Sequence, residues 1–141
     1  MDDLIAFLRA RLNDDEQTAR AVEDGSAPWN GQWTANGPDA LRTRNGHVLV
    51  YGHWSSDGRN LPMPLKPGLV DHIARHDPAR VLAEVEAKRL LLTEYAEVRG
   101  NEAADYEWAG GWARGLGQAV AFLALPYADH PDYRPEWAPT T

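Results

Sequence analysis

The chain has 141 residues, no cysteine and a formal net charge of −7, from 14 basic and 21 acidic residues. This length is typical of one domain, and the lack of cysteine excludes disulfide bonds, thiolate metal sites and a cysteine nucleophile. Because an acidic chain repels phosphate backbones, direct binding to nucleic acid is disfavoured. We therefore expect a single domain over residues 1–141 that does not contact DNA or RNA directly.

Residues 2–23 show the pattern of an amphipathic helix. Apolar residues recur at helical spacing, acidic residues occupy the first turn, and Gly25 follows the last turn. The chain opens with acidic residues, whereas a secretory signal opens with basic residues before a longer apolar run. The longest apolar run near the other end, residues 119–126, is too short to span a bilayer. We expect a cytoplasmic protein with no membrane segment.

Residues 25–68 are rich in glycine and proline, which interrupt helices and mark turns. Within them, Asn45-Gly46 favours a type I′ turn between two short antiparallel strands, the second of which covers residues 48–51. A third strand is expected near residues 32–34. Because two strands alone are marginally stable, this sheet must pack on helices. Residues 61–68 contain three prolines and are expected to form an extended connector.

Two helices are expected after this connector. The first is short and covers residues 69–75. Asp77-Pro78 then begins the second, because aspartate is a good N-cap and proline loses nothing at the first helical position. This second helix covers residues 78–98.

The last expected helix covers residues 102–124. Its apolar stripe places Trp108 and Trp112 in the core. It also contains four glycines, each of which weakens a helix by up to about 1 kcal/mol relative to alanine. Such a concentration indicates either a kink at Gly110-Gly111 or the close approach of a neighbouring helix backbone.

Residues 125–141 contain four prolines and three aromatic residues. The prolines exclude a regular helix or a central strand, and the aromatic residues are atypical of disorder, so this tail is expected to pack across the domain. The expected fold is therefore α+β: three main helices and one short helix packed with a small antiparallel β-hairpin sheet, followed by an irregular C-terminal tail. Its regions are an N-terminal helix, a Gly/Pro-rich hairpin region, a helical region and a tail, at 1–24, 25–68, 69–124 and 125–141.

Three blocks of the sequence carry a family resemblance. Residues 71–89, DHIARHDPARVLAEVEAKR, resemble the central signature of a small uncharacterised actinobacterial family with relatives in phages. Residues 123–133, LALPYADHPDY, and residues 2–8, DDLIAFL, resemble the same family at its two ends. Residues 26–70 do not resemble it closely. Members carry only a domain-of-unknown-function label, so the resemblance implies a cytoplasmic protein of bacterial or phage origin and no particular activity.

Histidine provides the main candidate for chemistry, since the chain has no phosphate-binding glycine loop and no nucleophile elbow. His72 and His76 are four residues apart, which places both rings on one face of a continuous helix. With His130 from the tail they would form a divalent metal site. A structural interpretation competes with this one, because Asp77-Pro78 would end the helix at His76 and histidine near a helix C-terminus complements its dipole. We favour the structural interpretation and predict no cofactor.

The six tryptophans are many for a chain of this size. Exposed tryptophan and tyrosine often anchor protein interfaces, and the candidates here are Trp29, Trp54, Tyr133 and Trp137. The leading hypothesis is a non-enzymatic regulatory or accessory protein that binds another protein. An alternative is a small metal-dependent enzyme or metal-binding protein that uses His72, His76 and His130.

Two further hypotheses concern partners. Residues 14–24 carry five acidic residues and one arginine, a net charge of −4, as an acidic mimic of nucleic acid would. The glycine-bearing helix at residues 102–124 could also pair with itself, most simply as a two-fold dimer.

Overall fold

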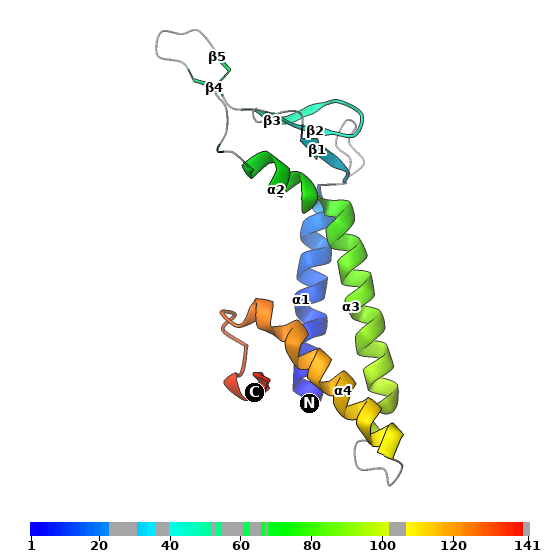
Figure 1. The fold of residues 1–141 in the computed structure, drawn as a ribbon. Coiled ribbons are helices and arrows are strands. Elements are labelled where there is room, and N and C mark those ends of the chain that lie inside the picture. Colours follow the sequence, from blue (N-terminus) through cyan, green and yellow to red (C-terminus); the bar gives the residue numbers. More distant parts are fainter. Residues whose placement is uncertain are drawn as a thin grey trace. The chain divides into compact units, whose positions relative to one another are not determined.

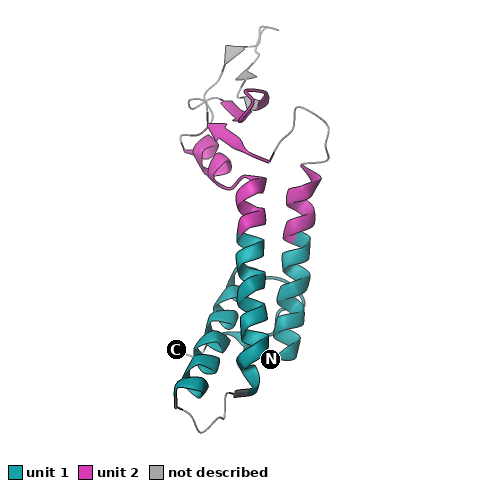
Figure 2. Ribbon diagram, turned by 90° about the vertical axis from the view of Figure 1, so that its right-hand side faces the viewer, with its two compact units in different colours: residues 1–14, 84–141 teal, residues 15–83 magenta. Residues whose placement is uncertain are grey.

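The computed structural model describes residues 1–22, 31–35, 40–51, 53–54, 61–62, 66, 68–101 and 107–139. The chain divides into two compact units (Figure 2), one of residues 1–14 and 84–141 and the other of residues 15–83. Helices α1 (Asp2–Ala21) and α3 (Pro78–Val98) each contribute residues to both units. The single domain expected over residues 1–141 stays a prediction.

The α+β class is confirmed (Figure 1). The described residues form three main helices, α1, α3 and α4 (Glu107–Ala124), and one short helix, α2 (Leu69–Arg75). Helices α2 and α3 have the bounds expected from the sequence, whereas α1 ends at Ala21 rather than at residue 23. Helix α4 is described from Glu107, because residues 102–106 lie outside the described part. No helix in the described residues is both long enough and apolar enough to cross a membrane.

A three-stranded antiparallel sheet lies in the second unit, in the order β1 (Trp33–Ala35), β2 (Ala40–Thr43) and β3 (Val48–Tyr51). It packs on α2, which contacts both β1 and β2. The turn between β2 and β3 differs from the expected type I′, because only Gly46 has a positive φ, of 88°. Thr43 and His47 close a three-residue loop through a 2.8 Å hydrogen bond from the Thr43 N–H to the His47 carbonyl. Glycine supplies the left-handed residue that this longer loop needs.

The expected connector at residues 61–68 is partly strand. Leu61–Pro62 forms β5, which pairs antiparallel with β4 (His53–Trp54). Residue 66 and residue 68 are described beyond it, and the rest of the connector lies outside the described part. The prolines therefore did not prevent a short pairing, since proline is tolerated at a sheet edge.

Helices from both ends of the chain build the core of the first unit. Leu4, Leu8 and Leu12 of α1 are fully buried, as are Leu92 and Tyr95 of α3. Helix α4 adds its own buried face, which consists mainly of small residues: Gly110, Ala113, Gly117, Val120, Ala121 and Ala124. At Gly117 an added Cβ would lie 3.3 Å from the Tyr95 ring. A close approach is thus observed at Gly117, but the neighbour is the Tyr95 side chain of α3 and not the helix backbone that was expected.

The expectation that Trp108 and Trp112 lie in the core is wrong. Trp108 is 78% exposed and Trp112 is 52% exposed. At about 100° per residue, the two tryptophans project from the side of α4 opposite Gly117 and Ala124. Helix α4 is apolar on both sides, so the spacing of its large residues did not reveal which side is buried.

The C-terminal tail packs against α1 within the first unit, as expected. The Phe7 ring lies 6.4 Å from the Tyr127 ring, 6.0 Å from the Tyr133 ring and 5.1 Å from the Trp137 ring, measured between centroids. An ion pair of 2.8 Å between Arg134 and Asp3 holds the same segment. One buried phenylalanine therefore anchors the irregular tail.

Candidate functional site

The outer face of α4 carries three of the large apolar side chains that solvent reaches among the described residues of the first unit. Trp108, Trp112 and Phe122 are 78%, 52% and 52% exposed. Small residues lie between them at helical spacing. We define the α4 outer face as Trp108, Gly111, Trp112, Gly115, Ala119 and Phe122. It contains no charged residue, and it combines protruding aromatic side chains with a shallow row of glycine and alanine.

Two glycines of the α4 outer face have no contact among the described residues that would explain them. A Cβ added at Gly111 or Gly115 would meet nothing within 4 Å, whereas one at Gly117 would meet the Tyr95 ring. Each glycine in a helix interior costs up to about 1 kcal/mol relative to alanine. The packing of the described residues therefore accounts for Gly117 and leaves Gly111 and Gly115 without a structural reason.

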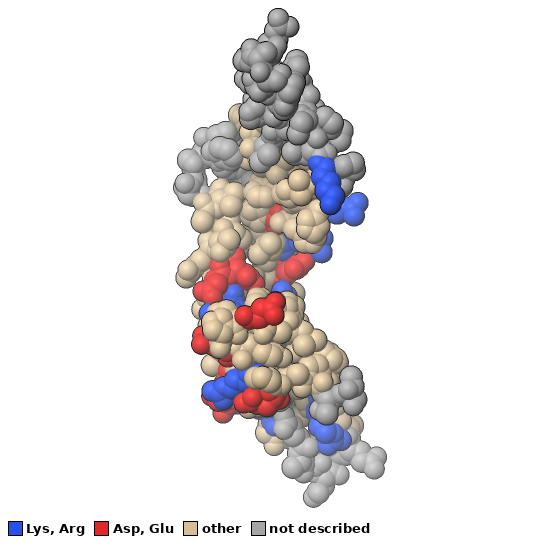
Figure 3. Space-filling view, turned by 90° about the vertical axis from the view of Figure 1, so that its left-hand side faces the viewer, with Lys and Arg blue, Asp and Glu red and all other residues tan. Residues whose placement is uncertain are grey.

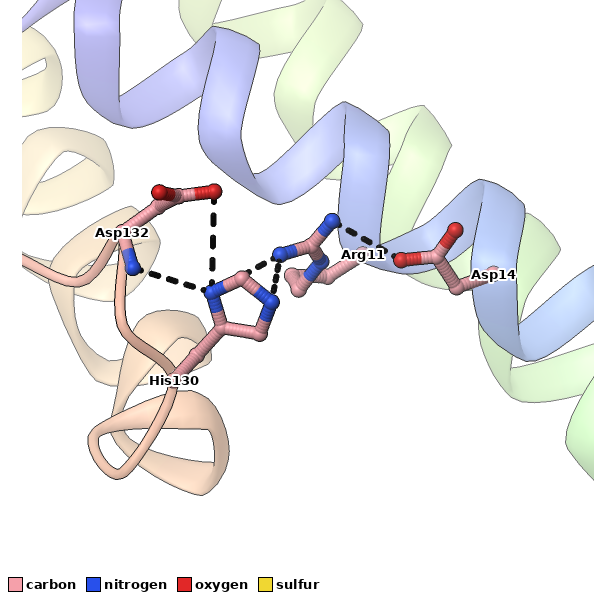
Figure 4. Close-up of polar contacts among 4 residues, drawn as sticks. All are labelled: Arg11, Asp14, His130 and Asp132. Atoms are coloured by element: carbon pink, nitrogen blue, oxygen red, sulfur yellow. Dashed lines mark hydrogen bonds and ion pairs between the residues drawn. The ribbon is translucent and has the colours of Figure 1, made fainter.

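A second candidate surface lies where the tail meets α1, around Arg11 and His130 (Figure 4). The Arg11 guanidinium lies 5.5 Å from the centre of the Phe7 ring, and its Nη2 pairs with Asp14 at 2.8 Å. Its Nη1 lies 2.9 Å from Nδ1 of His130 and also contacts Nε2. The backbone N–H of Asp132 donates to Nδ1 over 3.1 Å. His130 is therefore engaged in holding the tail against α1.

Tyr133 and Trp137, which were expected to meet a partner, are half-buried in the same tail cluster. The Trp137 ring lies 5.7 Å from the Tyr133 ring, and the Arg134 guanidinium lies 5.4 Å from its centre. The Tyr133 hydroxyl is buried and has no hydrogen-bond partner within the described residues. Grooves of about 590 and 460 Å³ flank Trp137, and both are lined by Asp3 and Arg134. A contact of Tyr133 or Trp137 with a partner stays a prediction. It is limited to the parts of these two side chains that line the grooves.

Trp29 and Trp54 complete the expected partner residues. Trp29 lies outside the described residues. The backbone of Trp54 belongs to β4, and its side chain lies outside the described part. The structure therefore places neither indole ring.

His72 and His76 lie together in the second unit. Their ring centroids are 4.5 Å apart, although α2 ends at Arg75 and His76 is its C-cap. Nδ1 of His76 lies 2.9 Å from the His72 carbonyl and donates to it, which leaves Nε2 as the acceptor of the neutral ring. His130 belongs to the other unit. In the part of the chain that the structure describes, no three histidine or carboxylate side chains are grouped to hold a metal ion.

Asp77 is the expected N-cap of α3 and also ties that helix to the sheet. Its Oδ1 accepts a hydrogen bond of 2.8 Å from the Arg80 N–H, and its Oδ2 accepts one of 3.1 Å from the Trp33 N–H. Beside it is a mainly apolar pocket of about 290 Å³, lined by Asp15, Thr18, Ala19, Val22, Trp33, His76, Pro78 and Val81. Both oxygens of the Asp77 carboxylate thus accept hydrogen bonds that hold the fold, in agreement with the interpretation of Asp77-Pro78 as the capped start of a helix.

Comparison with known proteins gives one match. Over residues 1–139 the chain matches a family of unknown function, DUF6221. The chain belongs to this family. The matched range includes residues 26–70, which the three resembling blocks had left out. No curated protein and no solved structure matches the chain. Membership of DUF6221 confirms the expected kind of family and assigns no chemistry to any residue.

Sequence reasoning missed the α4 outer face. The signal that could have found it is the spacing of the small residues on the other side, Gly110, Ala113, Gly117, Ala121 and Ala124. Small residues every three or four positions are typical of a helix face that packs closely on its neighbours. Assigning that face to the core would have left the tryptophans outside.

Proposed function

We propose that this protein is a non-enzymatic regulatory or accessory protein that works by binding protein, and that its main contact surface is the α4 outer face. The observation that carries the proposal is the exposure of Trp108, Trp112 and Phe122 on one side of one helix. Aromatic side chains dominate the energetics of interfaces, and a contiguous exposed apolar patch of a few hundred Å² is often a functional surface.

The magnitude of burial supports a contact of moderate strength. Aromatic side chains have surfaces of about 150–250 Å², so the exposed parts of these three amount to roughly 400 Å². At about 25 cal/mol per Å², covering them would contribute about 10 kcal/mol. Association itself costs about 4–15 kcal/mol. The aromatic side chains alone therefore roughly balance that cost, and a partner must also cover the residues beside them.

The other expected elements stay within the proposal. Trp29, Trp54, Tyr133 and Trp137 are secondary contact candidates, and the grooves beside Trp137 support the last two. The cytoplasmic setting is supported by the absence of cysteine, which suits a reducing compartment. The actinobacterial or phage origin rests on the resemblance of the three sequence blocks.

Photo-crosslinking from the α4 outer face tests the proposal. A benzoyl-phenylalanine placed at Trp112 in the host organism should yield a protein adduct on irradiation. The matched control is the same group at Leu90 of α3, which is 63% exposed but lies outside this face. Adducts at Trp112 and not at Leu90 would support the proposal. No adduct at Trp108, Trp112 or Phe122 under any condition of growth would refute it.

A metal-binding role is the second candidate, and the closeness of the His72 and His76 rings favours it. Two imidazoles alone form a weak site, because structural and catalytic zinc sites use three or four protein ligands. Native mass spectrometry of protein purified without chelators, with Zn²⁺ added, would detect one bound ion per chain. Binding lost in His72→Ala and kept in the control His47→Ala would support this role, and equal binding by both would oppose it.

The acidic-mimic hypothesis finds less support. Asp14 pairs with Arg11 and Glu16 pairs with Arg20, both at 2.8 Å, so part of the acidic stretch is neutralised within the chain. On the face that Figure 3 shows, acidic and basic side chains are mixed. A mimic needs an extended surface of one sign to compete with a phosphate backbone.

A further inference from the structure

The residues of the α4 outer face are arranged symmetrically about Gly115. Aromatic residues stand seven positions before and after it, Trp108 and Phe122, and small residues stand four positions before and after it, Gly111 and Ala119. Steps of four and seven residues both return to the same side of an α-helix. Trp112 departs from this pattern, because the residue three positions after Gly115 is Gln118. The other five residues of the face read nearly the same in both directions along the helix.

We infer that the partner of the α4 outer face is the same face of a second copy of this chain, packed antiparallel about a two-fold axis at Gly115. This inference rests on the proposed function and names its partner. In an antiparallel pair, a residue n positions before the axis meets the residue n positions after it on the other copy. Trp108 of each copy thus meets the partner's Phe122, and Gly111 of each copy meets the partner's Ala119. The two-fold axis makes each of these contacts occur two times in the dimer. Large meets large at the ends, small residues meet at Gly111 and Gly115, and Trp112 meets the partner's Gln118 beside the axis.

The unexplained glycines acquire a role in this arrangement. Gly115 and Gly111 are exposed and have open space where a side chain would be. At a helix crossing, such residues let two backbones approach closely, which brings the flanking aromatic side chains into contact. Each glycine costs the helix up to about 1 kcal/mol relative to alanine, and no contact among the described residues offsets this cost. In the dimer, contacts across the interface offset it.

Charge also favours a second copy at this face. Two chains of net charge −7 repel each other, so they can approach only where charge is sparse. Between Trp108 and Ala124 the sequence contains one charged residue, Arg114, which lies outside the α4 outer face. A partner with a strongly charged surface would gain nothing from this face and would leave its charges desolvated.

The area limits the strength of the dimer. Roughly 400 Å² of exposed aromatic surface per copy gives about 800 Å² in total, against 1,200–2,000 Å² for a standard stable interface. Half-buried Leu116 and Leu123 and exposed Leu125 border the face and supply part of the remainder. A dimer with a dissociation constant in the micromolar range is therefore expected.

Sedimentation velocity over a range of concentrations tests the inference. The expected result is a shift from 15.7 kDa toward twice that mass as the concentration rises through the micromolar range. Gly115→Leu adds bulk at the axis where the single chain has open space, so it should stay folded by circular dichroism and raise the dissociation constant at least tenfold. Leu90→Ala is the control and should leave it unchanged. A dimer that Gly115→Leu does not weaken would overturn the inference.

Paired charges test the antiparallel register. Trp108→Glu alone and Phe122→Lys alone should each weaken association strongly, and the double variant should associate more tightly than either single variant, because each new carboxylate then meets an ammonium of the other copy. A parallel dimer would oppose like charges and stay dissociated, which would refute the register. A chain that stays monomeric at all concentrations would refute self-association. In that case, adducts from Trp112 to a different protein would still support the proposed function.

Discussion

Replacing Trp108 with alanine tests which side of α4 packs against the rest of its unit. The side chain is 78% exposed, so about one fifth of a surface of about 250 Å², or about 50 Å², is buried. At about 25 cal/mol per Å² this burial contributes about 1.3 kcal/mol, and the higher helix propensity of alanine returns about 0.5 kcal/mol. We expect Trp108→Ala to lower the free energy of unfolding of the monomer by about 1 kcal/mol.

The opposite side of the helix provides the matched control. Val120 is 0% exposed, and removing its two methyl groups should cost about 2 kcal/mol or more, because burial is lost and a cavity remains. Val120→Ala should therefore lower the free energy of unfolding more than Trp108→Ala does, although valine is the smaller side chain. If α4 instead buried its tryptophans, Trp108→Ala would cost about 3–5 kcal/mol.

Urea unfolding followed by far-UV circular dichroism measures both variants without relying on tryptophan fluorescence. The measurement should be made in dilute protein, so that association does not add to stability. In thermal unfolding, 1 kcal/mol corresponds to a shift of about 3–4 °C for a chain of this length. A loss above about 3 kcal/mol in Trp108→Ala, together with a smaller loss in Val120→Ala, would refute the assignment of the two faces.

Three further predictions concern packing in the two units. Gly117→Ala places a methyl group 3.3 Å from the buried Tyr95 ring, whereas Gly111→Ala meets open space, so the first variant should be less stable than the second by about 1–3 kcal/mol in the same urea assay; equal stabilities would contradict this. Asp77→Ala loses both the helix cap and the bond to the Trp33 N–H and should cost about 2 kcal/mol, and a thermal midpoint within 1 °C or so of the unchanged protein would argue against it. Phe7→Ala removes the ring on which the tail packs, so amide hydrogens of residues 128–139 should exchange much faster in hydrogen-exchange mass spectrometry, and unchanged exchange would show that the tail is held in another way.

The sequence by itself determined the order of the helices and of the three-stranded sheet, but it did not reveal the pairing of β4 with β5. Asp77-Pro78 set the start of α3 through local chemistry, since the cap bond from the Arg80 N–H needs only a carboxylate three residues earlier. Gly46 likewise set the turn of the hairpin. These features depend on neighbours within a few residues, and a sequence shows such neighbours directly. The turn type differed from the expected one, because a type I′ turn needs a positive φ at both Asn45 and Gly46, and of these two only Gly46 has one.

Tertiary structure alone decided which apolar residues are buried. Helix α4 offers two apolar sides, and burial of the side with small residues became favourable because Tyr95 of α3 fills the space beside Gly117. In the same way, Phe7 drew Tyr133 and Trp137 toward α1 from more than a hundred positions away in the sequence. Burial is a property of the complementary surfaces of two elements, whereas the periodicity of one element states only which residues share a side. For that reason the main contact surface proposed for this protein is the α4 outer face, whereas the sequence pattern indicated the loops at residues 25–68 and the tail.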